Sequence, residues 1–163
     1  LYEPVAEERG LELKAEAEAP IFIRADRQLL GQAIANLIDN AIKYGTNGAP
    51  ERGPGAKPKV DVSAKAKGSM AEIVVTDRGP GVPASDRERV LDRFVRLEAS
   101  RSEPGSGLGL SLVAAVARLH GGSLRLEDNE PGLRVILALP MNGEALVNGA
   151  PHQAPLGAEI RPA

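Results

Sequence analysis

Two asparagines, a lysine and a tyrosine recur at helical spacing in the segment NLIDNAIKY, residues 36–44. Side chains three, four and seven positions apart lie on one face of an α-helix, so Asn36, Asn40, Lys43 and Tyr44 form a narrow row. The amide oxygen of Asn40 is a ligand that Mg²⁺ accepts together with phosphate oxygens and waters. Lys43, one turn on, can bring a positive charge to phosphate. Taken alone, such a row is more often a solvated helix face, so its meaning depends on the rest of the chain.

A carboxylate follows an apolar stretch further along. Asp77 comes after the segment IVV (73–75), which should be a central strand, and opens the glycine turn DRGPG (77–81). It can accept a hydrogen bond from an exocyclic amine, as the reading of adenine requires. Gly79 and Gly81 let backbone approach a flat base where a Cβ would collide. An Asp that merely starts a turn is the ordinary alternative.

A second glycine-rich stretch, GSGLG (105–109), precedes an apolar helical pattern. Bare backbone N–H groups at a helix start form an anion site, although a flexible hinge would have the same composition. The dinucleotide fingerprint G-x-G-x-x-G does not fit, because its last glycine would fall at Leu110 or Leu112. The P-loop and the signatures of eukaryote-type protein kinases are absent as well. A nucleotide bound here would occupy another kind of site.

The elements that must position these residues follow from the apolar spacing. Asp26 is a good N-cap for a long helix reaching Tyr44. Ser85 and Glu88 predict a capping box for a short helix ending near residue 93. A further helix runs from Gly107 to a glycine stop at Gly121. Strands are predicted over residues 11–14, 21–24, 60–66, 72–76, 123–127 and 133–139, and loops over 45–58 and 95–106.

Composition limits the class of protein. The 163 residues are 42% hydrophobic and 26% charged, which fits one globular domain with a full core. A formal net charge of -2 gives no electrostatic reason to expect nucleic acid or an anionic membrane surface as a partner. The absence of Cys excludes disulfides and thiolate chemistry and suits the cytoplasm. No apolar run has the length of a membrane span. Because the chain starts without Met, we expect it to be part of a larger protein.

Together these motifs resemble a known family. In order, NLIDNAIKY, DRGPG, a DRF segment centred on Phe94 and GSGLGLS are similar to the N, G1, F and G2 boxes of the ATP-binding catalytic domain of bacterial sensor histidine kinases. The resemblance implies an α/β fold of the Bergerat type, a two-layer sandwich of a mixed β-sheet against three helices. It also implies a linker from a missing dimerisation and phosphoacceptor hairpin (1–10), an ATP-binding catalytic domain (11–140) and a flexible tail (141–163).

The resemblance assigns roles to the row on the long helix. Asn40 would coordinate Mg²⁺, Asn36 and Lys43 would contact the nucleotide, and Tyr44 would pack near the adenine. The ATP-binding residues that it implies are Asn36, Asn40, Lys43, Tyr44, Asp77, Gly79, Gly81, Phe94, Arg96, Arg101, Gly105, Gly107, Leu108 and Gly109.

It also assigns roles to the two glycine-rich stretches. Asp77 would read the adenine amine with the turn glycines beside it, and the glycines of GSGLG would close on the phosphates. The segment 94–106 would be the ATP lid, in which Arg96 and Arg101 are phosphate partners. If both Asn40 and Asp77 face a cleft, replacing either with Ala should abolish Mg·ATP binding and leave the fold intact.

One residue separates a kinase from an ATPase. Gyrase-like and mismatch-repair members of the superfamily place a Glu, the general base for water, one turn before the Mg²⁺-binding Asn; here Asn36 takes that place. An amide cannot take a proton from water at neutral pH. The resemblance therefore implies a histidine kinase domain that binds Mg·ATP and donates the γ-phosphoryl group to a His on a separate dimerisation domain in two-component signalling.

The same resemblance implies partners and a location. The partners would be the dimerisation and phosphoacceptor domain of the parent chain and the receiver domain of a response regulator, with no nucleic acid and no direct membrane contact. The domain would be cytoplasmic even if the parent is anchored in the inner membrane. Neither His120, at a helix end, nor His152, in the tail, resembles an acceptor, so we expect no autophosphorylation. The alternative is a regulatory module of the same fold, of the anti-sigma type, that binds nucleotide or a partner without kinase activity.

Overall fold

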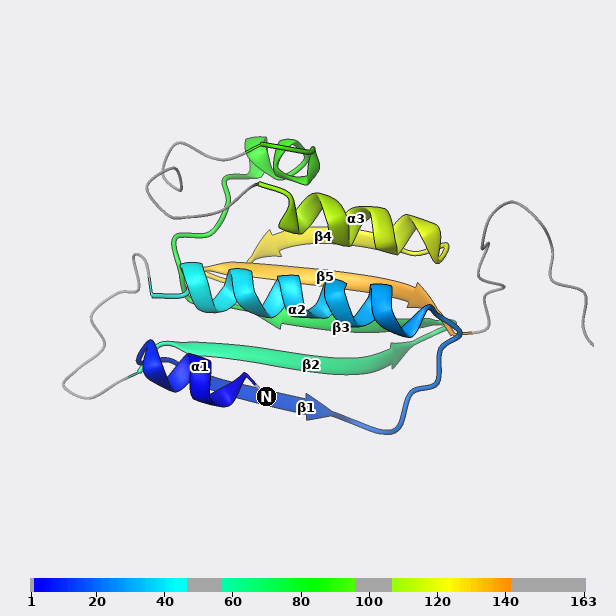
Figure 1. The fold of residues 1–163 in the computed structure, drawn as a ribbon, viewed down its shortest axis with the longest axis horizontal. Coiled ribbons are helices and arrows are strands. Elements are labelled where there is room, and N and C mark those ends of the chain that lie inside the picture. Colours follow the sequence, from blue (N-terminus) through cyan, green and yellow to red (C-terminus); the bar gives the residue numbers. More distant parts are fainter. Residues whose placement is uncertain (1, 47–56, 96–106, 142–163) are drawn as a thin grey trace, which may run out of the picture.

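The structure is a computed structural model of the chain that describes residues 2–46, 57–95 and 107–141. Five strands form one mixed sheet in the order β1-β2-β3-β5-β4, in which β1 and β2 are parallel and the other neighbours are antiparallel (Figure 1). The elements are α1 (Glu3–Glu8), β1 (Glu12–Ala17), α2 (Arg27–Tyr44), β2 (Lys59–Lys67), β3 (Met70–Thr76), the 3₁₀ helices η1 (Ala84–Asp86) and η2 (Arg89–Leu91), α3 (Gly109–Leu119), β4 (Ser123–Asp128) and β5 (Leu133–Pro140).

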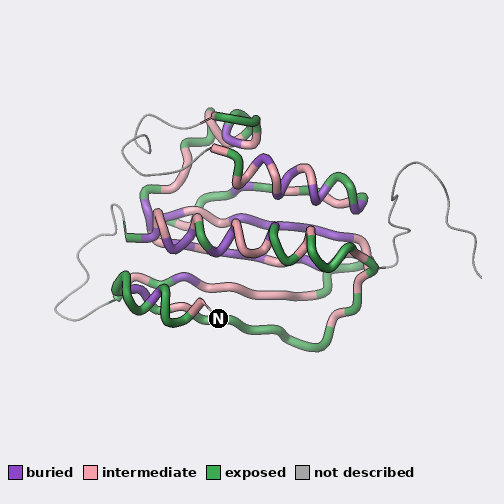
Figure 2. The backbone as a smooth tube through the Cα atoms, in the orientation of Figure 1, coloured by how far each residue is buried: buried purple, intermediate pink, exposed green. Residues whose placement is uncertain are grey.

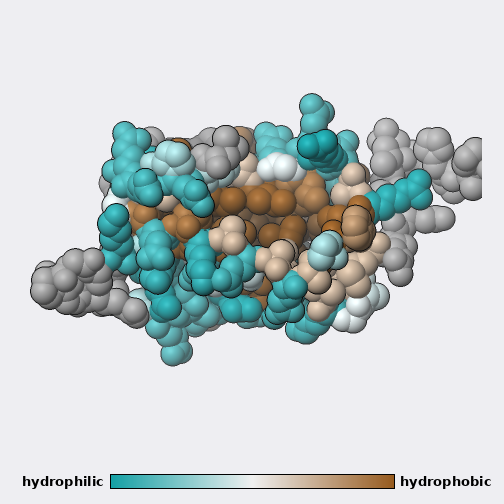
Figure 3. Space-filling model, turned by 90° about the horizontal axis from the view of Figure 1, so that it is seen from below, coloured by the Kyte–Doolittle hydropathy of each residue, from teal (hydrophilic) through white to brown (hydrophobic). Residues whose placement is uncertain are grey.

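The core lies between the sheet and the helices. Along β5, Val135, Leu137 and Leu139 belong to the hydrophobic core, whereas Ile136 and Ala138 are buried on the opposite face of the sheet. The burial colouring shows β3 and β5 as the most deeply buried strands (Figure 2). Seen from the β1 side, the apolar layer reaches the surface as a band between hydrophilic borders (Figure 3). The predicted two-layer α/β sandwich is confirmed.

The long helix α2 begins and packs as its sequence predicts. The side chain of Asp26 accepts a hydrogen bond from the backbone N–H of Leu29 at 2.9 Å, which is N-cap geometry. The buried stripe of the helix consists of Ala33, Leu37, Ile38, Ala41 and Ile42. Because this stripe faces the sheet, the row that starts at Asn36 is turned to one side of it, toward α3.

The end of α3 is fixed by a glycine motif. Gly121 has a φ of 68°, and its N–H donates to the carbonyl of Arg118 at 3.0 Å, while Gly122 N–H donates to Ala117 at 2.8 Å. This is the Schellman arrangement, in which a left-handed residue satisfies the last carbonyls of a helix. The predicted stop at Gly121 is confirmed.

Two predictions of secondary structure were wrong. Residues 21–24 alternate between partly buried and exposed, as a strand would, but they pair with no strand and lead into α2. Residues 85–93 hold two short 3₁₀ helices without a side-chain cap, instead of one capped helix. Helix α1 lies in the segment 1–10, which the sequence analysis described as a linker. Its Ala6 is fully buried in the core, and Pro4 in the first turn is the signal for it.

Some predictions lie outside the described residues. The lid arginines, Gly105, most of the loop 45–58 and nearly all of the tail fall in residues 47–56, 96–106 and 142–163. Within the described ranges, no helix has the length and hydrophobicity needed to cross a membrane.

Candidate functional site

The start of α3 lies against the amide row of α2. A Cβ placed on Gly109 would lie 3.2 Å from Nδ2 of Asn40 and 3.6 Å from Oδ1 of Asn36. Only the bare backbone of a glycine allows this approach without displacing an amide. The first N–H groups of α3, which have no acceptor within the helix, therefore share one location with two side-chain amides from a segment about 70 residues earlier.

The turn after β3 packs onto the end of α2. A Cβ on Gly79 would lie 2.2 Å from the carbonyl oxygen of Tyr44, so no other residue fits there without a backbone shift. Gly81 has a φ of 71°, and its Cβ would lie 2.8 Å from the carbonyl oxygen of Gly132. The turn 77–81 is thus held between the end of α2 and the loop that joins β4 to β5.

Asp77 is buried in this turn and is only 6% exposed. Its Oδ1 accepts hydrogen bonds from the backbone N–H groups of Gly79 at 2.8 Å and Leu133 at 3.2 Å. Burial raises the pKa of the carboxyl above its ordinary value, and these two hydrogen bonds offset part of the rise. Because Oδ1 is part of the turn, we expect that replacing Asp77 will affect the fold as well as nucleotide binding, contrary to the prediction from the sequence.

The amides of α2 differ in how they are held. Asn36 donates from Nδ2 to the carbonyl of Gln32 at 2.9 Å, which leaves Oδ1 on the side of α3. Asn40 is half-buried and forms no hydrogen bond with any residue in the described part of the chain. Its amide oxygen is therefore available as a metal ligand.

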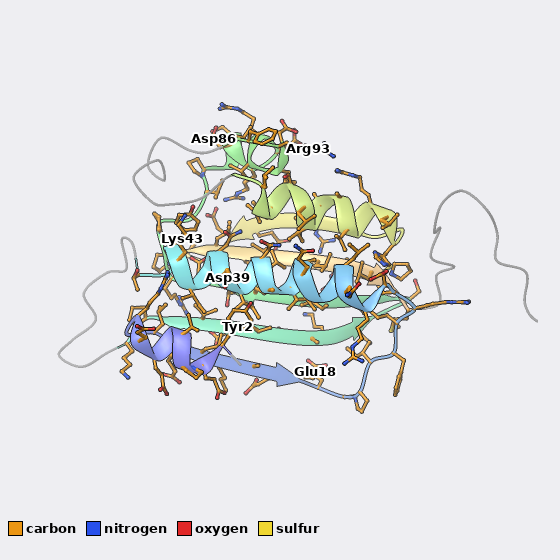
Figure 4. The ribbon with its side chains drawn as sticks, in the orientation of Figure 1. Tyr2, Glu18, Asp39, Lys43, Asp86 and Arg93 are labelled. Carbon is orange, nitrogen blue, oxygen red and sulfur yellow. The ribbon has the colours of Figure 1, made fainter. Side chains whose placement is uncertain are left out.

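Lys43 and Tyr44 contact each other at the end of α2. The ammonium of Lys43 donates to the Tyr44 hydroxyl at 3.0 Å and lies 4.7 Å from the centre of its ring, a cation–π distance. Lys43 lies at the C-terminal end of α2, where β3 ends and β5 begins (Figure 4). The positive charge of this row is thus at the same end of the molecule as Asp77.

The remaining predicted residues lie on both sides of the undescribed segment. Phe94 is 73% exposed with a φ of 65°, a left-handed conformation that costs energy for an aromatic residue. Gly107 has a φ of 70°, and Leu108, 38% exposed, is the N-cap residue of α3. Arg96, Arg101 and Gly105 lie outside the described residues.

The loop between β4 and β5 was not predicted from the sequence to take part in the site. Asn129 donates from Nδ2 to the carbonyl of Asp77 at 2.7 Å, and Gly132 and Leu133 also touch the Asp77 turn. The segment NEPG (129–132) had only the composition of a turn. Nothing in a single sequence indicates which distant carbonyl its Asn side chain meets.

In the part of the chain that the structure describes, no three His, Cys, Asp or Glu side chains are grouped as metal ligands. A shallow pocket lies at the opposite end of the sheet, lined by residues 18–22, Ala66 and Met141, far from the convergence of α2 and α3. One amide oxygen beside helix N–H groups fits an ion such as Mg²⁺ that arrives bound to phosphate.

Comparison with known proteins agrees with this arrangement. The family model of the histidine kinase-, DNA gyrase B- and HSP90-like ATPases matches residues 25–143. The sensor protein MprB of Mycolicibacterium vanbaalenii, named a signal transduction histidine-protein kinase/phosphatase, is 43% identical over 116 residues, which are 71% of this chain and 22% of that protein. MprB of Mycobacterium tuberculosis is 43% identical over 110 residues, 68% of this chain and 20% of that protein. The chain thus spans about a fifth of the length of these relatives.

Solved structures give the same result. A mycobacterial sensor histidine kinase MprB structure aligns with a TM-score of 0.68 and 35% identity, covering 88% of this chain and 90% of that one. The ATP-binding domain of PrrB from Mycobacterium tuberculosis aligns with a TM-score of 0.55 and 32% identity over 78% of this chain and 79% of that one. With the family match over most of the sequence, these findings show that the chain belongs to the histidine kinase-, DNA gyrase B- and HSP90-like ATPases, as a domain homologous to those of MprB and PrrB.

Proposed function

We propose that this domain binds Mg·ATP where α2, the turn 77–81 and the start of α3 meet, and that it donates the γ-phosphoryl group to a His on a separate dimerisation domain. The observation that carries the proposal is the contact of Gly109 with the amides of Asn36 and Asn40. It joins a metal ligand to a helix terminus that favours phosphate.

Each side chain has a definite task in this proposal. Asn40 supplies an oxygen to Mg²⁺, which neutralises charge on the transferring phosphoryl group. Lys43 contributes a point charge to the phosphates, exchanging its contact with Tyr44 for one with the nucleotide. Asp77 accepts a hydrogen bond from the adenine amine. Arg96 and Arg101, in the segment before Gly107, remain proposed phosphate partners.

The chemistry is phosphoryl transfer rather than hydrolysis. Asn36 stands one turn before Asn40, and its Nδ2 is committed to the helix backbone. Since an amide cannot deprotonate water, the site has no general base at the position where hydrolases of the superfamily carry Glu. The γ-phosphoryl group is then preserved for a His acceptor.

The relatives suggest the wider setting. They are named signal transduction histidine-protein kinase/phosphatase, and this chain matches about a fifth of their length. We therefore extend the proposal to a parent protein with a dimerisation and phosphoacceptor domain and a response regulator as the final acceptor. In that setting the domain acts in the cytoplasm.

Calorimetric titration tests the binding step. ATP should bind with Mg²⁺ present and more weakly after chelation, and Asn40→Ala should abolish the binding of Mg·ATP. Heat signals for ATP that are the same with and without the metal would contradict the assigned role of Asn40. Absence of ATP binding would contradict the proposal as a whole.

Transfer is tested with labelled ATP. The chain alone should acquire no acid-labile phosphate, because His120 is 4% exposed and both of its ring nitrogens contact backbone atoms. A supplied dimerisation and phosphoacceptor domain from an MprB relative should become labelled. Binding of ATP without any transfer to that domain would favour the alternative, a regulatory module without kinase activity.

A further inference from the structure

Asp77, just past the end of β3, and Leu133 of β5 depart from the usual hydrogen bonding of an antiparallel pair. Facing residues of an antiparallel hydrogen-bonded pair exchange two N–H to carbonyl bonds. Asp77 N–H donates to the carbonyl of Leu133 at 3.0 Å, as expected. The return bond from Leu133 N–H goes instead to the carboxylate oxygen Oδ1 of Asp77, at 3.2 Å. The carboxylate of Asp77 therefore accepts the hydrogen bond that its backbone carbonyl would normally accept.

Asn129 replaces the donor that the ladder loses. With Leu133 N–H diverted, the carbonyl of Asp77 accepts from Nδ2 of Asn129 at 2.7 Å, the shortest hydrogen bond made by this turn. The loop is itself fixed, because Asn129 N–H donates to the carbonyl of Gly132 at 3.2 Å. A buried carbonyl without a donor would destabilise the fold. The hydrogen bond from Asn129 avoids this, although Leu133 N–H is bonded to the carboxylate instead.

The consequence is a carboxylate with one oxygen committed and one left over. Oδ1 accepts from both Gly79 and Leu133, whereas no described residue donates to Oδ2. A carboxylate fixed in this way distinguishes bases, because adenine presents an amine at position 6 where guanine presents a carbonyl. An acceptor facing the guanine carbonyl would be repelled.

We propose that Asn129 is the positioning residue that sets selectivity for adenine, by holding the Asp77 backbone so that the carboxylate stays aimed at the 6-amino group. This inference rests on the proposed nucleotide site and goes beyond it by naming what orients the base-reading group. Without the Asn129 amide, Leu133 N–H returns to the Asp77 carbonyl, and Oδ1 loses one of its two donors.

The test compares two nucleotides on the full chain. ATP and purine riboside triphosphate differ only in the 6-amino group, so the ratio of their dissociation constants reports the contact with Asp77. Asn129→Ala should weaken ATP about tenfold and leave the analogue unchanged, because only ATP uses an oriented acceptor. A loss of general structure would weaken both nucleotides equally, and that result, like an unchanged ratio, would overturn the inference.

A matched control comes from the neighbouring residue. Asp128 forms an ion pair with Arg87 at 2.7 Å and is not among the hydrogen-bond partners of Asp77. Asp128→Asn should leave the ratio as in the wild type. If the wild type binds ATP and Asn129→Ala keeps its selectivity, only this inference fails. If the wild type binds neither nucleotide, the proposed function fails with it.

A measurement without ligand covers a variant that binds poorly or unfolds easily. In the wild type, the amide resonance of Leu133 should shift as Asp77 titrates, because its N–H donates to the carboxylate. In Asn129→Ala, or in Asn129→Ser if the first variant does not fold, this pH-dependent shift should shrink by at least half. A shift of the same size in the variant would overturn the inference.

Discussion

At the scale of single residues, Asn40 and Asp77 occupy different environments although the sequence assigns both to one site. Asn40 is half-buried and forms no hydrogen bond with a described residue, whereas Asp77 is buried and bonded to two backbone N–H groups. Asn40→Ala should abolish Mg·ATP binding and change the free energy of unfolding by less than about 0.5 kcal/mol. Asp77→Ala should abolish binding and also cost about 2–4 kcal/mol, since it leaves the N–H groups of Gly79 and Leu133 without acceptors. Denaturant unfolding beside calorimetry separates the two outcomes, and equal stability of the variants would contradict the burial of Asp77.

The pKa of Asp77 gives a second prediction at this scale. Burial raises the folded pKa above the ordinary value of 3.8. The charged carboxylate therefore costs stability at neutral pH, and this cost disappears as the pH falls through the folded pKa. Affinity for ATP should change in the opposite sense and fall as the pH is lowered through the same range, because protonation weakens the acceptor for the amine. Purine riboside triphosphate, which shares the titrating phosphates, should show no such loss. Parallel pH curves for both nucleotides would contradict the role of Asp77.

At the scale of elements, the site depends on the close approach of the β4–β5 loop to the turn after β3. Gly132 has a φ of 118°, and a Cβ there would lie 1.9 Å from the Asp77 carbonyl oxygen. Gly132→Ala should cost more than about 3 kcal/mol, because both the backbone conformation and the packing forbid it. Gly68→Ala is the matched control: its φ is 60°, but no atom lies within 4 Å of the added Cβ, so only the conformational cost of about 1–2 kcal/mol remains. Thermal or denaturant unfolding of both variants checks the difference.

A buried histidine joins the ends of two helices. His120 accepts at Nε2 from the N–H of Asp26, the N-cap residue of α2, at 2.9 Å, and its Nδ1 lies 2.8 Å from the carbonyl of Val116. These contacts require a neutral ring with its proton on Nδ1. His120→Ala should cost about 2–3 kcal/mol by leaving a cavity and an unsatisfied N–H at the start of α2. His120→Asn, whose oxygen can replace one nitrogen as an acceptor, should cost less. A larger loss of stability than in the Ala variant would contradict the role of His120 in joining the two helix ends.

At the scale of the whole molecule, the two faces of the sheet differ. One face holds the core, and the other carries ion pairs around Glu72, whose side chain is 5% exposed. Arg125 donates to it at 3.2 Å and Lys67 lies 3.5 Å away. Desolvation raises the pKa of Glu72, but the hydrogen bond from Arg125 and the two positive charges outweigh it, so the net pKa is lowered. In the described part of the chain, these charged side chains lie on the face opposite the core.

Acid titration of stability tests this role. Because the folded pKa of Glu72 lies below the unfolded value of 4.5, its contribution is present above that value and is lost as the pH falls through the folded pKa. Glu72→Gln should lower the free energy of unfolding by about 1–2 kcal/mol at pH 7 and by less in acid. Glu127→Gln, in exposed pairs of 3.6 and 3.8 Å, should change it by less than about 0.5 kcal/mol. Equal effects of the two variants would contradict the prediction.

The sequence by itself determined what depends on neighbours along the chain. The N-cap at Asp26, the glycine stop at Gly121, the β2–β3 hairpin and the row on α2 follow from local spacing, and the order of the motifs identified the family. The tertiary structure alone decided that Asp77 is buried, that α1 belongs to the core and that Asn129 lies against Asp77, 52 residues earlier. The physical reason is that a turn residue encodes its own backbone geometry, but not which distant donor or acceptor the packed sheet brings to it.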